Sequence, residues 1–169
     1  EKAIAGSNDY ADALAILKKD SKLKAMDIYE HIAVEDIQKA ADILKPVYEK
    51  TQKRDGYVSM EVSPFLANDT EKTIEEAKRL WKWVNRPNVM IKVPATAEGI
   101  PAIRELIGLG ININVTLLFS QEAYEAVHRA YIDGLEKFQK SGGDLSSVAS
   151  VASFFVSRID TLIDSMIEE

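Results

Sequence analysis

The sequence contains no cysteine among its 169 residues. Disulfide bonds, zinc sites with thiolate ligands and cysteine nucleophiles are therefore excluded. It also lacks any apolar run near the roughly 18 residues that a membrane-spanning helix needs, and no secretory signal pattern is visible. We therefore expect a cytoplasmic protein without a membrane partner. The chain opens on Glu1 rather than Met, which favours a fragment of a longer protein.

Clusters of basic residues are missing as well. The formal charge is −6, because 27 Asp and Glu residues outnumber 21 Lys and Arg residues. This balance argues against a nucleic-acid partner, although a few local basic side chains suffice to bind a phosphorylated metabolite. With 46% hydrophobic residues, the composition is that of a single soluble globular domain with a core.

The spacing of apolar residues changes near residue 56. Residues 1–55 show helical periodicity, as at Val34 and Ile37, and no strand pattern. Pro46 is expected to kink or end the helix that contains it. From residue 56 to residue 169 we predict four βα units, with strands at 57–63, 88–94, 111–118 and 148–156.

Alternating strands and helices predict an α/β fold with parallel strands. The strand starts at residues 57, 88, 112 and 148 are 31, 24 and 36 residues apart. A TIM barrel of the (β/α)8 type averages roughly 31 residues per unit. Four units cannot close an eight-stranded barrel, so we expect either an open sheet or one incomplete barrel domain over residues 1–169.

Polar residues interrupt one face of the predicted strands. Strands covered by helices on both faces are almost entirely apolar, yet Glu61, Lys92, Asn114 and Thr116 lie in the C-terminal halves of three of them. On the strand at 111–118, Leu117 alternates with the apolar set and is expected to face the core. The carboxyl ends of the strands are where barrel active sites form.

A lysine on such a face has two explanations. A buried, unpaired ammonium is costly, so it either pairs with an acid or loses its proton. A neutral Lys92 would be a nucleophile toward carbonyl groups. Alternatively, Lys92 and Glu61 form a structural ion pair, which is a weak stabiliser when it is buried. The pattern alone leaves both open.

Five segments, in the same order, resemble the transaldolase family. Asn88-Val-Met-Ile-Lys-Val-Pro-Ala-Thr96 is similar to its active-site strand, and Glu1–Tyr10 to the segment after its second strand. Ser59–Ser63, Ile113–Ser120 and Ser153–Asp160 resemble its third, fifth and sixth strands. The resemblance runs over the whole chain and implies a barrel piece that covers strands three to six.

The resemblance implies a reaction. Lys92 would form a Schiff base with a ketose phosphate, fructose 6-phosphate or sedoheptulose 7-phosphate, and pass a dihydroxyacetone unit to an aldose phosphate in the pentose phosphate pathway. Glu61 and Thr116 would hold the catalytic water. No metal or organic cofactor is implied. The implied substrate-binding residues are Asn114 for the donor hydroxyls, Ser153 and Arg158 for the phosphate, and Phe155 as a pocket wall.

The chain departs from the family pattern in what it leaves out. An acid/base aspartate, a substrate-binding asparagine and a second phosphate-binding arginine belong to strands that it does not contain. Phe154 and Ser157 also stand where some relatives have Pro and Gly. Two alternatives therefore remain: a Schiff-base aldolase that cleaves without transfer, and a non-catalytic piece whose exposed sheet edges cause self-association.

Overall fold

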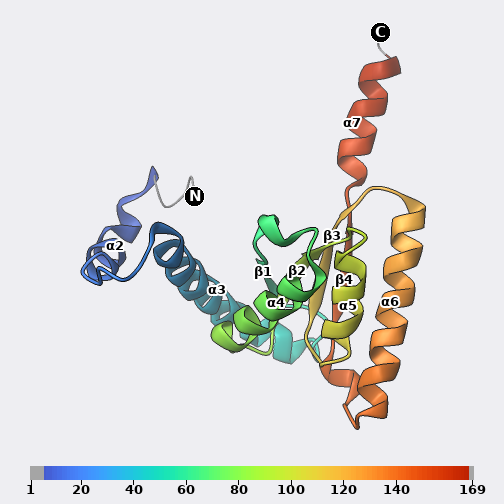
Figure 1. Ribbon diagram of the computed structural model, residues 1–169, viewed down its shortest axis with the longest axis horizontal. Coiled ribbons are helices and arrows are strands. Elements are labelled where there is room, and N and C mark those ends of the chain that lie inside the picture. The colour runs from blue at the N-terminus through green and yellow to red at the C-terminus, as the bar shows by residue number, and fades with distance from the viewer. Residues whose placement is uncertain (1–5, 168–169) are drawn as a thin grey trace.

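The computed structural model describes residues 6–167 (Figure 1). The four predicted strands are confirmed, and each is followed by a helix. Residues 1–5 of the segment Glu1–Tyr10 lie outside the described residues. The elements in chain order are η1 (Asn8–Tyr10), α2 (Ala11–Leu17), α3 (Ala25–Lys50), β1 (Val58–Glu61), η2 (Pro64–Leu66), α4 (Thr70–Val84), β2 (Val89–Pro94), α5 (Gly99–Ile107), β3 (Ile113–Leu118), α6 (Gln121–Lys140), η3 (Leu145–Ser147), β4 (Ser150–Phe154) and α7 (Val156–Ile167).

The four strands form one parallel sheet in the order β1-β2-β3-β4. Each strand therefore lies beside its neighbour in the sequence, as in a barrel of successive βα units. The register places Glu61 opposite Lys92 and Lys92 opposite Asn114. Three of the predicted site residues are thus in line across three strands.

The core lies between the sheet and its helices. Alternate strand residues such as Ile91, Ile113 and Val115 are at most 1% exposed, and they pack against buried side chains of α4, α5 and α6. Burying each such aliphatic side chain stabilises the fold by about 1.5–3 kcal/mol. The alternate residues that include Lys92 and Asn114 are left for the opposite face.

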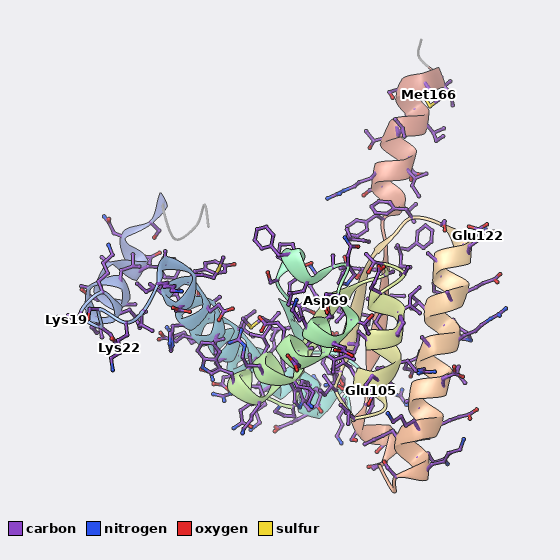
Figure 2. All side chains as sticks on the ribbon, in the orientation of Figure 1. Lys19, Lys22, Asp69, Glu105, Glu122 and Met166 are labelled. Carbon is purple, nitrogen blue, oxygen red and sulfur yellow. The ribbon has the colours of Figure 1, made fainter. Side chains whose placement is uncertain are left out.

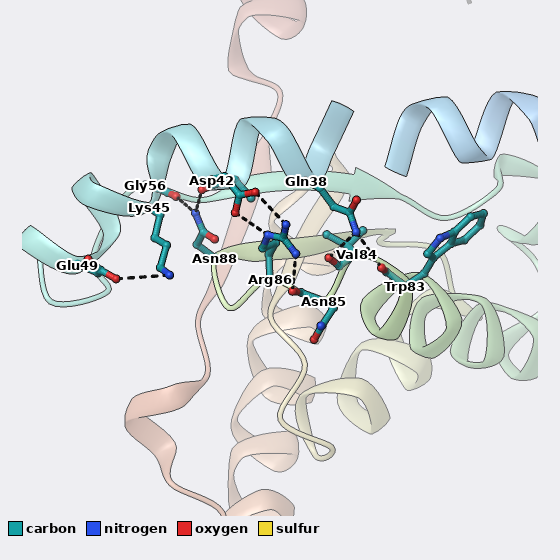
Figure 3. A network of polar contacts seen from close by, with 11 residues as sticks. Gln38, Asp42, Lys45, Glu49, Gly56, Trp83, Val84, Asn85, Arg86 and Asn88 are labelled. Atoms are coloured by element: carbon teal, nitrogen blue, oxygen red, sulfur yellow. Dashed lines mark hydrogen bonds and ion pairs between the residues drawn. The ribbon is translucent and has the colours of Figure 1, made fainter. Parts of the chain in front are cut away.

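Polar contacts attach α3 to the segment between α4 and β2 (Figure 3). Nδ2 of the buried Asn88 donates to the carbonyl oxygens of Ala41, at 2.8 Å, and Gly56, at 2.9 Å. Arg86 makes a two-pronged pair with Asp42, at 2.6 and 2.9 Å. The hydrogen bond to the guanidinium lowers the pKa of the Asp42 carboxyl below its ordinary value.

Of the two outcomes expected at Pro46, a kink or the end of its helix, the second is wrong, because α3 continues to Lys50. Proline has no N–H to donate to the carbonyl four residues earlier, which belongs to Asp42. Both Pro46 and Asp42 are exposed, so water can satisfy that carbonyl.

The expectation that Leu117 faces the core is also wrong. Leu117 has a φ of 59° and is 47% exposed, whereas Leu118 is fully buried. The register of β3 and β4 shifts between Val115 and Leu118. An irregularity of this kind re-aims the side chains beyond it, and here it delivers Leu118 to the core in place of Leu117.

The last helix projects away from the sheet (Figure 1). Leu162, Met166 and Ile167 on α7 are 62%, 65% and 77% exposed. Figure 2 shows Met166 far from the strands. Between residues 6 and 167, no helix combines the length and the apolar character needed to cross a membrane.

Candidate active site

Lys92 and Glu61 form an ion pair on the face of the sheet opposite the core. Nζ of Lys92 lies 3.3 Å from Oε2 of Glu61, and the two side chains are 31% and 53% exposed. The pairing follows from the sheet, since parallel β1 and β2 place the two residues opposite each other. A carboxylate at this distance is close enough to exchange a proton with the lysine nitrogen or with a group bound to it.

A chain of hydrogen bonds crosses the same face. Nδ2 of Asn114 on β3 donates to Oγ of Ser59 on β1, at 3.1 Å. Oγ of Ser153 on β4 donates to Oδ1 of Asn114, at 2.8 Å. The structure thus brings together Asn114 and Ser153, two of the predicted substrate-binding residues, and adds Ser59.

Thr116 lies on β3 two residues beyond Asn114. It is 2% exposed, and its register partner on β2 is Pro94, two residues beyond Lys92. Its backbone oxygen accepts a hydrogen bond from the backbone N–H of Ala95, at 2.8 Å. Within the part of the chain that the structure describes, its hydroxyl makes no direct hydrogen bond to Glu61 or Lys92, so a shared water would have to join them.

Phe155 and Arg158 form a cluster where β4 passes into α7. The ring of Phe155 stacks on that of Phe119, with centroids 5.3 Å apart and planes 18° apart. The guanidinium carbon of Arg158 lies 4.9 Å from the centroid of Phe155. Arg158 itself is exposed. This cluster places an aromatic surface and a positive charge just beyond the carboxyl ends of β3 and β4.

Two hollows flank the polar face. One, of about 560 Å³, runs between α3 and β1 and is lined by Tyr29, Ser59 and Glu61 among others. The second, of about 510 Å³, includes Ser59, Met90 and Asn114. Solvent and small molecules can therefore reach the polar face from both sides of β1. Among residues 6–167, no group of three or more His, Cys, Asp or Glu side chains could hold a metal ion.

Comparison with known proteins decides the family. The model of the transaldolase/fructose-6-phosphate aldolase family matches residues 1–169. The chain belongs to this family. A transaldolase of Trichodesmium erythraeum is 51% identical over 170 residues, which is 100% of this chain and 44% of that protein. Transaldolase 1 of Streptomyces avermitilis is 53% identical over 96% of this chain and 43% of its own length.

The chain spans under half the length of these curated relatives. A transaldolase of Thermobifida fusca shows the same proportion, with 49% identity over 99% of this chain and 45% of that protein. The four-stranded parallel sheet is therefore that of a partial transaldolase-family barrel.

Sequence reasoning missed three residues of this transaldolase-family chain. Ser59 lies in the segment that resembles the third strand, but its residue type and spacing indicate no role. Asn88 and Asn112 alternate with the polar set, yet they are 0% and 1% exposed and bind backbone groups instead of facing a ligand. Nδ2 of Asn112 donates to the carbonyl oxygens of Pro87 and Val89, at 3.1 and 3.0 Å. Their position at the starts of β2 and β3, away from the carboxyl ends, was the available signal.

Proposed function

We propose that this transaldolase-family chain carries the Schiff-base part of a transaldolase active site. The parent enzyme transfers a dihydroxyacetone unit from fructose 6-phosphate or sedoheptulose 7-phosphate to an aldose phosphate. The observation that carries the proposal is the Lys92–Glu61 pair, at 3.3 Å on the open face of the sheet. A lysine that is open to solvent can meet a carbonyl compound, and the neighbouring carboxylate can carry protons during the addition.

The chemistry assigns each proton. The neutral Lys92 nitrogen adds to the ketone carbon and gives a carbinolamine, whose hydroxyl leaves as water after Glu61 returns a proton. A base must take the proton of the hydroxyl on the far carbon of the bond that breaks, and the family resemblance assigns this base to the aspartate of a strand that the chain does not contain. The iminium accepts the electron pair of the broken carbon–carbon bond and becomes an enamine, while the far carbon leaves as an aldehyde. The enamine that remains attacks the acceptor aldehyde, whose oxygen takes up the proton released in the cleavage step, and water then hydrolyses the new iminium to restore the free amine. We assign Thr116 to the water that passes these protons.

Substrate recognition follows the geometry of the other side chains. Asn114 and Ser153 hydrogen-bond each other and face the same open surface. We assign Asn114 to the donor hydroxyls and Phe155 to the pocket wall. The exposed guanidinium of Arg158 fits phosphate oxygens and would hold the phosphate group. Ser153 also belongs to the proposed phosphate site, although its proton is donated to Asn114 when no ligand is bound.

A Schiff-base aldolase is the second candidate, because the family description names fructose-6-phosphate aldolase beside transaldolase. Both reactions begin with the same lysine adduct. They differ in the fate of the enamine, which is protonated in an aldolase and transferred in a transaldolase. Product analysis of the longer parent protein with and without an aldose phosphate acceptor separates them.

Trapping of the adduct tests the proposal in this chain. The protein is incubated with fructose 6-phosphate, reduced with borohydride, digested and examined by mass spectrometry. We expect a mass increase at Lys92 and none in Lys92→Met. Lys137 is a matched control, because it is also paired, 2.7 Å from Glu105, but lies on the outer helices. Labelling spread over surface lysines, with none on Lys92, would defeat the proposal.

A further inference from the structure

Ser59 links strands that are not neighbours in the sheet. It lies on β1, and its hydroxyl accepts the hydrogen bond of Asn114 on β3, at 3.1 Å, across the intervening β2. Contacts between alternate strands are those that build the side-chain layers of a barrel interior. Ser59 also lines both hollows beside the polar face. Its side chain is therefore positioned at the candidate site without any role in the proposed chemistry.

The hydrogen bonds of Asn114 fix the orientation of its carboxamide. An asparagine side chain has two N–H donors and an oxygen with two lone pairs. Ser59 accepts one N–H, and Ser153 donates to the oxygen at 2.8 Å. The nitrogen is thereby held toward β1 and the oxygen toward β4. One N–H and one lone pair stay available for a ligand.

We infer that Ser59 is a positioning residue that aims the free N–H of Asn114 at a hydroxyl beside the carbonyl of the bound ketone. The inference rests on the proposed Schiff-base function of Lys92. Lys92 and Asn114 are opposite each other in the register of β2 and β3, so a carbon attached to Lys92 presents its substituents to Asn114. The recognised class is an α-hydroxy ketone. A ketone without that hydroxyl gains nothing from the orientation of the amide.

Two small ketones separate orientation from general damage to the site. The intact 169-residue chain and its variants are incubated with hydroxyacetone or acetone and reduced with borohydride, and the rate of Lys92 labelling is measured. Ser59→Ala should slow labelling by hydroxyacetone about fivefold, the effect expected for one hydrogen bond. The rate of labelling by acetone should stay within about twofold of the rate in the unsubstituted 169-residue chain. Ser59→Thr keeps the hydroxyl and should restore the preference for hydroxyacetone.

Ser150→Ala is the matched control. The hydroxyl of Ser150 on β4 donates to the backbone oxygen of Ile113, at 2.9 Å, so its removal deletes a hydrogen bond of the same sheet without touching Asn114. This variant should keep the ratio of the two labelling rates. A Ser59→Ala variant that slows both ketones equally would overturn the inference, because a structural defect predicts that result.

The orientation of Asn114 is also measured without any reaction. In ¹⁵N–¹H spectra, Ser59→Ala should shift the side-chain amide signals of Asn114 and speed their exchange with water, whereas Ser150→Ala should do neither. Unchanged Asn114 signals in Ser59→Ala would overturn the inference even if Lys92 is labelled. If neither ketone labels Lys92 in the unsubstituted 169-residue chain, the Schiff-base function fails. The amide spectra then still decide whether Ser59 holds Asn114.

Discussion

Nζ of Lys92 and Oε2 of Glu61 lie 3.3 Å apart on adjacent parallel strands, with 31% and 53% of their side chains exposed. Solvent screens a pair of this kind, and such pairs contribute about 0–1 kcal/mol to stability. Stability from this pair is therefore a poor explanation of why two charged residues stand in these strands. Its accessibility suits a group that must meet a ligand.

The variant Glu61→Gln separates a structural role of the Lys92–Glu61 pair from a catalytic one. The substitution keeps the size of the side chain and removes its charge, so the free energy of unfolding should change by less than about 1 kcal/mol. Loss of a proton-transfer group should slow Schiff-base formation at Lys92 by about 100-fold or more. Urea denaturation gives the first quantity and borohydride trapping over time gives the second. A variant with parental labelling kinetics would show that Glu61 has no part in the chemistry.

Substitution of Asn88 should have the opposite effect to that of Glu61, namely a loss of stability without a direct effect on the chemistry. Its Nδ2 donates to two backbone carbonyls from a fully buried position. Asn88→Ala leaves both carbonyls without that partner and should cost about 2–4 kcal/mol in the free energy of unfolding. Asn68→Ala, at an exposed position, should change it by less than about 0.5 kcal/mol. Equal urea midpoints for the two variants would contradict the structural role of Asn88.

The contrast between Asn88, which binds backbone groups, and Asn114, which lies at the candidate site, shows how far sequence reasoning reaches. Alternation placed Lys92 and Glu61 on one face, and the rule that parallel strands share their carboxyl end brought them together. The same alternation could not tell Asn88 from Asn114, because it carries no information on depth along the strand. Asn88 lies just before β2, where it binds the backbone of α3 and of the loop that precedes β1, whereas Asn114 lies inside β3.

Features that depend on register were beyond the sequence. The hydrogen bond between Ser59 and Asn114 requires the alignment of two strands that do not pair with each other in the sheet. Leu117 leaves the core because β3 shifts its pairing with β4, and no local pattern records a shift between strands. Pro46 stays within α3 because its surroundings are open to water. For Leu117 and Pro46, a long-range or solvation effect overrode a local preference.

Tyr57 predicts a loss of stability at alkaline pH. Its hydroxyl donates to the backbone oxygen of Lys53, at 2.9 Å. Burial, followed by the neighbouring Tyr48, raises the pKa of Tyr57 from 10.0 to about 12. The folded state thus holds the proton more tightly than the unfolded state, so this stabilisation is complete below pH 10 and is lost as the pH rises toward 12.

Unfolding experiments at two pH values check this linkage. Between pH 9 and pH 11.5, the unsubstituted chain should lose more of its free energy of unfolding than Tyr57→Phe, because phenylalanine has no phenolic proton to release. A direct absorbance titration of tyrosinate should lose its highest-pH component in the same variant. Identical pH dependence of the two proteins would show that Tyr57 titrates normally in the folded state.

The free edges of the sheet predict self-association of the 169-residue chain. Within residues 6–167, β1 pairs only with β2 and β4 pairs only with β3. The β4 edge also exposes Val151 and Phe154, at 44% and 37%. Unpaired edges with apolar side chains recruit further strands. Because both edges run in the same direction, β4 of one copy can pair in parallel with β1 of another.

Light scattering coupled to size exclusion, over a series of concentrations, should show species larger than 18.8 kDa. Val151→Lys places a charge on the edge and should shift the distribution toward the monomer. Ile43→Lys removes a more exposed apolar residue, at 75%, from α3, and should leave the distribution unchanged. Equal effects of the two substitutions would assign association to general surface hydrophobicity. An unsubstituted chain that stays monomeric at every concentration would contradict the prediction and mean that the sheet edges are protected in solution.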